Sequence, residues 1–388
     1  MKPQKSCLSI SCKLVLFSFV FLTLILVSCI NQQPKLATDI RSTDVSIPIE
    51  VSFSTGIANF TNNLKSIPES QPTFIYAYSW KDRAVYTGEF AAIKHKFDLN
   101  FLSGQIEFSQ STDFIFRNNK EAMLLCSDER KLVLLNIDNQ DYKIISYDTL
   151  IQSNTYPLSF WNFPMVSAKE LYFSIAYSGI IIKDIGSIVD YFSRKSGLSF
   201  RIDQGNFRSE LVGEFPLAYQ KGLFYNDFYS KFVKFPDESI ANSFSCDDSI
   251  YLYHQTKKST YFMGSKNAAP FKPYPLTELR NGNYKRQYTV EEPRYLQLIY
   301  DPFTDLVYRV YKHKSDYLVD GKVINDRDIP WSLLVSTTDF STIEEYEFRD
   351  GKYSPIGMMP TADGLFILKF EQNNEKEIKG SLFRIPKP

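Results

Sequence analysis

The sequence predicts an all-β protein, a β-propeller of four-stranded antiparallel blades. Among its 388 residues are 32 Phe and 25 Tyr, side chains that favour strands over helices. Short apolar and aromatic runs alternate with polar turns along the whole chain, and no long helical periodicity is present. The runs recur every ~45–50 residues, the length of a four-stranded propeller blade. We expect six blades, with seven as the alternative.

The stretch Ser243–Ser265 shows the repeated unit most plainly, as three strands joined by two turns. In order, these are a strand around Phe244, a turn at Asp247–Asp248, a strand at Ile250–Tyr253, a turn at Lys257–Lys258 and a strand at Tyr261–Met263. Short strands separated by polar turns form an antiparallel meander. This unit is the basis of the propeller prediction.

A turn followed by an apolar strand recurs elsewhere in the chain. The copies are Ala84–Tyr86, Leu132–Leu135, Leu171–Phe173, Ile250–Tyr253, Leu306–Tyr308 and Leu365–Leu368, each preceded by polar residues. Gln220–Tyr225 is a weaker copy and the reason for the seven-blade alternative. Glu121–Tyr147 is the clearest single blade, with three strands. The spacing varies, which we attribute to turns of different length.

The chain begins with the features of an export leader, predicted over residues 1–28. Three lysines precede the apolar run Leu14–Val27, and Leu26–Cys29 resembles a bacterial lipobox. The run is shorter than the ~20 residues of a spanning helix, so an uncleaved membrane anchor is the less favoured interpretation. We expect Cys29 to be lipidated, because its thiol is the acceptor in that class of leader.

Residues 29–43 are polar and aperiodic, and predict a lipidated tether before a single propeller domain at 44–388. Alternating apolar residues from Val45 to Phe53 predict a half-buried strand, and Pro48 places it at an edge or at the ring closure. Asp184–Phe192 has helical spacing and predicts one short helix. A pair of β-sandwiches would need a central linker, and the sequence shows no convincing one.

Composition and motifs disfavour several function classes. The 44 Lys and Arg balance 44 Asp and Glu, which argues against a nucleic-acid partner. The three histidines have no metal-binding spacing, and neither a G-x-S-x-G motif nor a phosphate-binding glycine loop is present. Asp138–Asp141 predicts a hairpin turn rather than a calcium loop, and Asp326–Asp328 predicts solvated charges. We therefore expect no metal, no cofactor and no catalytic residue, and we expect Cys126 and Cys246 to be buried thiols.

The most informative polar run is Thr277–Arg294, which we expect to be a loop between blades. Arginine and tyrosine are typical of recognition surfaces, and arginine binds carboxylates through two hydrogen bonds. A charged outer hairpin without a ligand is the alternative. The candidate binding residues are Arg280, Tyr284, Lys285, Arg286, Tyr288 and Arg294.

Several motifs together resemble the Bacteroidetes lipoproteins of the DUF4221 family. They are the lipobox leader, the unit Ser243–Tyr253 and the C-terminal run Tyr295–Phe370 with its Asp363–Ile367 segment. The resemblance covers the mature chain and implies a six-bladed propeller of the TolB-like class. It implies an envelope location but no activity.

These observations favour a lipid-anchored, non-catalytic binding or scaffold module of the cell envelope, with a protein or glycan partner and no nucleic acid. The membrane is reached through the lipid on Cys29. The outer membrane is the expected location, with the periplasmic side slightly favoured over the cell surface because no acidic cluster follows Cys29. The alternative is an envelope enzyme, a glycan hydrolase or lyase with carboxylates converging on the propeller channel.

Overall fold

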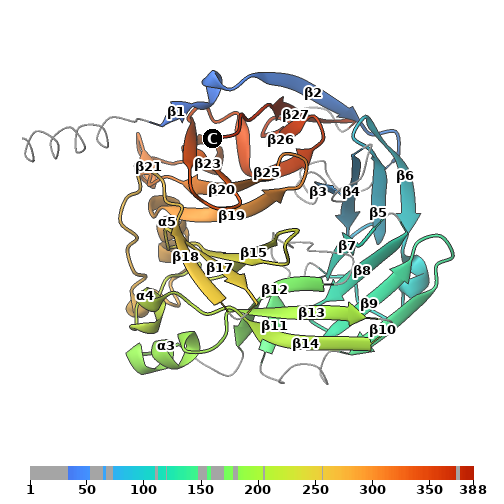
Figure 1. Ribbon diagram of the computed structural model, residues 1–388, viewed down its shortest axis with the longest axis horizontal. Coiled ribbons are helices and arrows are strands. Elements are labelled where there is room, and N and C mark those ends of the chain that lie inside the picture. The colour runs from blue at the N-terminus through green and yellow to red at the C-terminus, as the bar shows by residue number, and fades with distance from the viewer. Residues whose placement is uncertain are drawn as a thin grey trace, which may run out of the picture.

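The computed structural model describes residues 34–52, 64–66, 73–109, 112–118, 120–146, 155–158, 170–177, 182–203, 206–255, 257–372 and 376–388. In this part of the chain, six antiparallel sheets are arranged around a ring (Figure 1). The fold is the predicted six-bladed β-propeller.

Each blade has four antiparallel strands, whose order across the sheet runs from the ring axis outward in a propeller. Blade 1 contains, in that order, β3 (Leu64–Ser66), β4 (Phe74–Ser79), β5 (Ala84–Glu89) and β6 (Ala92–Asp98). Blade 2 contains β7 (Thr112–Phe116), β8 (Glu121–Cys126), β9 (Lys131–Asn136) and β10 (Tyr142–Ser146). Blade 3 contains β11 (Thr155–Leu158), β12 (Glu170–Tyr177), β13 (Gly197–Asp203) and β14 (Asn206–Val212).

The other three blades follow the same pattern. Blade 4 contains β15 (Ser230–Lys234), β16 (Ile240–Phe244), β17 (Ser249–His254) and β18 (Lys257–Phe262). Blade 5 contains β19 (Arg294–Asp301), β20 (Leu306–Lys312), β23 (Trp331–Thr337) and β24 (Ile343–Phe348). Blade 6 contains β25 (Tyr353–Thr361), β26 (Gly364–Lys369), β27 (Glu377–Phe383) and β2 (Ser42–Pro48).

The N-terminal strand β2 closes the ring as the outer strand of blade 6. It pairs with β27 from Ser42↔Phe383 to Pro48↔Glu377, with Ile47 fully buried. Pro48 is the last residue of β2, which fits the expected closing strand.

The residues just before β2 are also docked. β1 (Lys35–Leu36) pairs in parallel with β24 of blade 5, and the 3-10 helix η1 (Ala37–Asp39) follows it. Docked structure therefore starts at Lys35, whereas the sequence predicted a tether up to residue 43. The leader and Cys29 lie outside the described residues.

The recurring turn–strand motif does not mark the same strand in every blade. It marks the third strand in blades 1, 2 and 4 (β5, β9 and β17). In blades 3, 5 and 6 it marks the second strand instead (β12, β20 and β26). This alternation adds to the irregular spacing, which we had attributed to turn length alone.

The weaker seventh copy is not a strand. Residues 217–220 form the short helix α4 (Leu217–Gln220), which ends before Gly222 at a φ of 88°. The following Phe224 and Tyr225 are buried but belong to no strand. The seven-blade alternative was therefore wrong, because Phe224 and Tyr225 instead pack on the rings of Phe192 in the helix at 185–192 and Tyr219 in α4.

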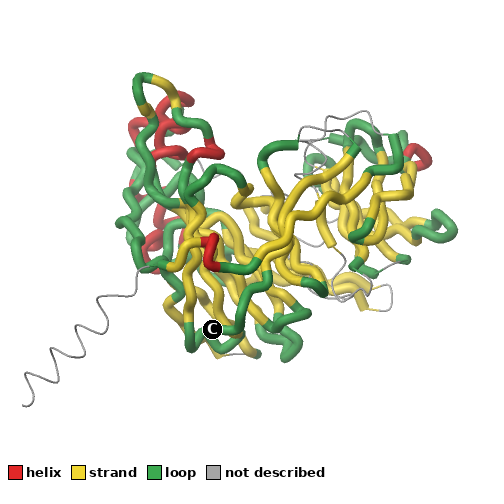
Figure 2. Tube along the Cα trace, turned by 90° about the horizontal axis from the view of Figure 1, so that it is seen from above, coloured by secondary structure: helices red, strands yellow, loops and turns green. Residues whose placement is uncertain are grey.

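Insertions lie on one face of the ring. Helix α3 (Ile185–Phe192), predicted at Asp184–Phe192, and the hairpin β21 (Leu318–Val319)–β22 (Lys322–Val323) each follow the second strand of a blade. Helices α4 and α5 (Gly282–Glu291) each follow the fourth strand. In an up-and-down blade both connections leave the same face, which we call the insertion face. Figure 1 shows α3, α4 and α5 on one side of the molecule, and most of the red helical segments of Figure 2 lie together on one side.

The core lies between neighbouring blades. One apolar cluster links blades 4 and 5 through residues such as Val233, Tyr295 and Leu334, and another links blades 6 and 1. The aromatic cluster around Phe192 and Tyr219 extends from blades 2, 3 and 4 into the helices of the insertion face. Cys246 is a buried free thiol in this aromatic cluster, and Cys126 is one in a further cluster between blades 1 and 2, as predicted.

Arg309 is the largest fully buried side chain and connects blade 4 to blade 5. Its guanidinium donates to the backbone carbonyl oxygens of Met263 at 2.8 Å, Phe244 at 3.2 Å and Asp247 at 2.5 Å. It stacks on the Tyr295 ring with 3.4 Å to the centroid. One side chain thus satisfies three carbonyl groups of the neighbouring blade.

Replacing Arg309 with Met should destabilise the protein by about 3 kcal/mol or more, because three buried acceptors lose their donor. Urea unfolding of the purified mature chain measures this change. The exposed Arg327 serves as the control, because its ion-pair partner Asp328 is also exposed, and R327M should cost less than about 1 kcal/mol. Equal, small effects of both variants would contradict the role given to Arg309.

Candidate functional site

The segment predicted to bind a partner is a helix rather than a loop. The Asn281 side chain accepts a hydrogen bond from the Tyr284 backbone N–H at 3.1 Å and so caps the N-terminus of α5. At the other end, the Lys312 ammonium donates to the carbonyl oxygens of Val290 at 2.6 Å and Glu292 at 2.9 Å. Both ends of α5 are therefore fixed, the second by blade 5.

The two tyrosines of this segment pack into the protein. Tyr288 is buried and donates from its hydroxyl to the Lys272 carbonyl oxygen at 2.6 Å. Tyr284 and Tyr288 both pack on the Tyr274 ring, at centroid distances of 5.4 and 4.8 Å. These two candidates therefore hold α5 in place, and they do not form an exposed recognition surface.

The three basic candidates Arg280, Lys285 and Arg286 are exposed. Arg280 lies in the turn before α5, and Lys285 and Arg286 lie on the helix. The structure thus presents basic side chains on a helix whose other side is anchored by aromatic packing. Such a surface suits an acidic or anionic partner.

Arg294 is separate from these residues, as the first residue of the inner strand β19. Its Nη1 lies 3.8 Å from Oδ2 of Asp227, which precedes the inner strand β15 of blade 4. The two side chains are 21% and 26% exposed, and the Arg294 Nε is buried without a hydrogen-bond partner. The neighbouring Lys231 ammonium donates to Ser245 Oγ at 2.6 Å.

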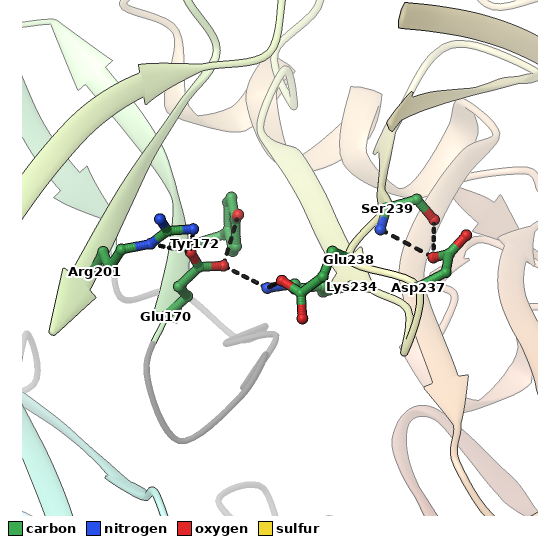
Figure 3. Close-up of polar contacts among 7 residues, drawn as sticks. All are labelled: Glu170, Tyr172, Arg201, Lys234, Asp237, Glu238 and Ser239. Atoms are coloured by element: carbon green, nitrogen blue, oxygen red, sulfur yellow. Dashed lines mark hydrogen bonds and ion pairs between the residues drawn. The ribbon is translucent and has the colours of Figure 1, made fainter. Parts of the chain in front are cut away.

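A second polar cluster joins blades 3 and 4 on the face opposite the insertions, because β15 starts on the insertion face and ends beside this cluster. Glu170 at the start of β12 accepts from the Lys234 ammonium at 2.5 Å and pairs with Arg201 (Figure 3). Tyr172 donates to the same carboxylate at 3.3 Å, and Glu238 pairs with Lys234. The Glu170 and Lys234 side chains are 7% and 4% exposed.

Burial would raise the Glu170 pKa, but hydrogen bonds and charges from Lys234 and Arg201 outweigh it and lower the pKa below the ordinary 4.5. The carboxyl is therefore ionised at neutral pH and holds no proton to donate. Two cations already occupy its oxygens. This arrangement is that of a connection between blades and does not favour the carboxylate pair of a glycosidase.

Sequence reasoning did not find Glu170, Lys234 or Asp227. Glu170 and Lys234 are charged residues at the ends of apolar strands, and that pattern was a usable signal. Their pairing, however, joins residues far apart in the chain. Asp227 had no distinguishing sequence pattern.

The histidines do not form a catalytic centre among the described residues. His95 and His254 are exposed, and His313 contacts Ser332 Oγ at 2.8 Å through Nε2. Ser332 is fully buried, so a substrate cannot reach it, and burial lowers the His313 pKa.

Asp138–Asp141 forms the predicted turn between β9 and β10. The described ranges contain no group of three or more side chains able to hold a metal ion.

Comparison with solved structures supports the fold prediction. A member of the DUF4221 family from Bacteroides vulgatus has a TM-score of 0.72 and 14% sequence identity, over 90% of this chain and 99% of that one. The predicted resemblance to DUF4221 proteins is thus confirmed at the level of the fold. No protein-family model and no curated protein matches the sequence.

Two further solved structures are more distant. A Bacteroides fragilis protein has a TM-score of 0.47 and 10% identity, over 91% of this chain and 99% of that one. Virginiamycin B lyase from Staphylococcus aureus has a TM-score of 0.41 and 8% identity, over 88% of this chain and 99% of that one. Similarity at this level gives no indication of activity.

Within the described ranges, no helix has the length and apolar character needed to cross a membrane.

Replacing Glu170 with Gln should lower the unfolding free energy at pH 7 by about 2 kcal/mol, because the buried Lys234 then keeps only the exposed Glu238 as a charge partner. A lowered pKa in the folded state stabilises the protein above pH 4.5, and this stabilisation is lost as the pH falls through the folded-state value. The difference between E170Q and wild type should therefore shrink in acid. Urea unfolding between pH 7 and 4 measures it, and a pH-independent difference would contradict the ion-pair role.

Proposed function

We propose that the protein is a lipid-anchored propeller of the cell envelope, which binds a protein or glycan partner without catalysing a reaction. The lipobox-like Leu26–Cys29 supports the anchor. The exposed basic residues in and just before α5 support the binding role, because the helix is capped at its N-terminus and held by Lys312 of blade 5 at its C-terminus. The outer membrane is the proposed location, since the leader resembles those of bacterial lipoproteins.

The docked N-terminal segment bears on the geometry of such an anchor. The Lys35 ammonium lies 2.9 Å from both carboxylate oxygens of Glu344, and Ile40 is buried beside blades 5 and 6. Only Ile30–Gln33 separate a lipidated Cys29 from Pro34, so at ~3.5 Å per residue the lipid lies within about 18 Å of the propeller edge. A lipidated protein would therefore stay close to the membrane surface.

Replacing Cys29 with Ser should abolish lipidation and release the protein from the membrane fraction. The measurement is incorporation of an alkyne fatty acid into the tagged protein, together with fractionation of the cells. Substitution of Cys12, which precedes the apolar run, is the matched control and should change neither result. Persistent labelling of C29S would contradict the assigned lipidation site.

Reversing the three exposed charges with R280E, K285E and R286E should abolish capture of the partner from native envelopes. The melting temperature should change little, because exposed charges contribute little to stability. Affinity capture with mass spectrometry measures the partner. The control carries the same reversals at Lys81, Lys94 and Lys120, exposed residues of blades 1 and 2. Unchanged capture by the α5 variant would remove this surface from the proposal.

A further inference from the structure

Asp227, Lys231 and Arg294 form a charged group where the insertion face meets the ring axis. Arg294 begins the inner strand of blade 5, and Asp227 and Lys231 flank the start of the inner strand of blade 4. These two strands are neighbours in the ring. In a propeller, the beginnings of the inner strands surround one end of the central channel.

Positive charge exceeds negative charge around Lys231. The pKa of its buried ammonium is lowered by burial and by the nearby Arg309 and Arg294, and is raised by one carboxylate, Asp227. The Cys246 thiol, also close, has its pKa raised to about 12 by burial and remains neutral. Arg309 is engaged by backbone carbonyls, and by Asp247 and Asp248 through charge, on its blade 4 side. Asp227 is thus the carboxylate whose negative charge acts on both Lys231 and Arg294.

Arg294 has unused capacity to bind an anion. Its Nη1 is 3.8 Å from Asp227 Oδ2, which is longer than a hydrogen bond, and its Nε is buried without a partner. The side chain is 21% exposed whereas Nε is not, so a ligand would meet the terminal Nη1 and Nη2 groups. These groups offer two parallel donors, the geometry that matches a carboxylate.

One aromatic side chain, Tyr229, lies next to this charged group. It is partly buried, and the charge of Asp227 acts on its hydroxyl. The preceding Phe228 packs on Tyr191 and Phe192 in the aromatic cluster and belongs to the core. Aromatic rings have apolar faces on which flat, partly apolar ligands such as sugar rings stack. A carboxylate receptor beside the Tyr229 ring fits an acidic sugar.

We propose that Arg294 binds the carboxylate of a uronic acid in a glycan, with Asp227 as the internal group that the ligand carboxylate displaces. This inference deepens the proposed binding function by naming the ligand class, and it rests on the protein being a binding module. It concerns Arg294 and not the exposed charges of α5.

The test uses methyl glucuronide and methyl glucoside, which differ only at C6, a carboxylate carbon in the first and a hydroxymethyl carbon in the second. NMR titration of the mature wild-type chain should show binding of the glucuronide and at least about tenfold weaker binding of the glucoside, the effect of one charge-assisted contact. R294Q should reduce glucuronide affinity to the level of the glucoside. R349Q, which changes an exposed arginine at the rim of the same blade, should not alter it.

D227N distinguishes a ligand site from a structural ion pair. Removal of the competing carboxylate should tighten glucuronide binding by about threefold or more, and loss of a structural pair would only lower stability. Equal or absent binding of both sugars, or unchanged affinity in D227N and R294Q, would overturn the proposal.

Tighter binding of N-acetylglycine than of the glucuronide would overturn the sugar assignment. The α5 variants keep Arg294, so failure of envelope capture and failure of this test are separate results.

Discussion

The pairing of β2 with β27 is the contact on which the ring depends. Each blade buries its faces against two neighbours, so all six interfaces are complete only when the chain ends meet. Seven residue pairs, from Ser42↔Phe383 to Pro48↔Glu377, join segments from opposite ends of the sequence. Because β1 and η1 immediately precede β2, any force on the proposed lipid anchor would act first on blades 5 and 6, where the ring closes.

The insertion face obtains its rigidity from the same core as the blades. The aromatic cluster continues from Phe244 in blade 4 through Phe215 and Tyr219 to Phe192 of α3, with ring centroids 4.8–6.4 Å apart along these contacts. Tyr274 and Tyr288 extend it to α5. Connections that would otherwise be loops are therefore packed elements, and side chains on their outer surfaces hold fixed positions.

The sequence predicted the strands well because their apolar alternation is local information. It predicted Lys257–Lys258 as a turn, whereas Gln255 is a turn residue with a φ of 54° and both lysines begin β18. Helix α5 was predicted as a loop, because its polar sequence has almost no apolar periodicity and it is fixed by Lys312 of a distant strand. The contacts Glu170–Lys234 and Asp227–Arg294 join different blades, so no local pattern could show them.

The hydrogen-bond and ion-pair partners of each charged group distinguish a structural role from a binding role. Arg309 has three carbonyl acceptors and an aromatic ring, and Glu170 has two cations and a tyrosine hydroxyl. Neither could exchange these partners for a ligand without a large loss of stability. The Nε of Arg309 is buried without a hydrogen-bond partner, as is that of Arg294, so exposure and the long ion pair distinguish Arg294. Its nearest carboxylate is 3.8 Å away and the side chain is partly exposed, so a ligand carboxylate would add contacts without removing any hydrogen bond. Among these three charges, Arg294 therefore fits a binding role.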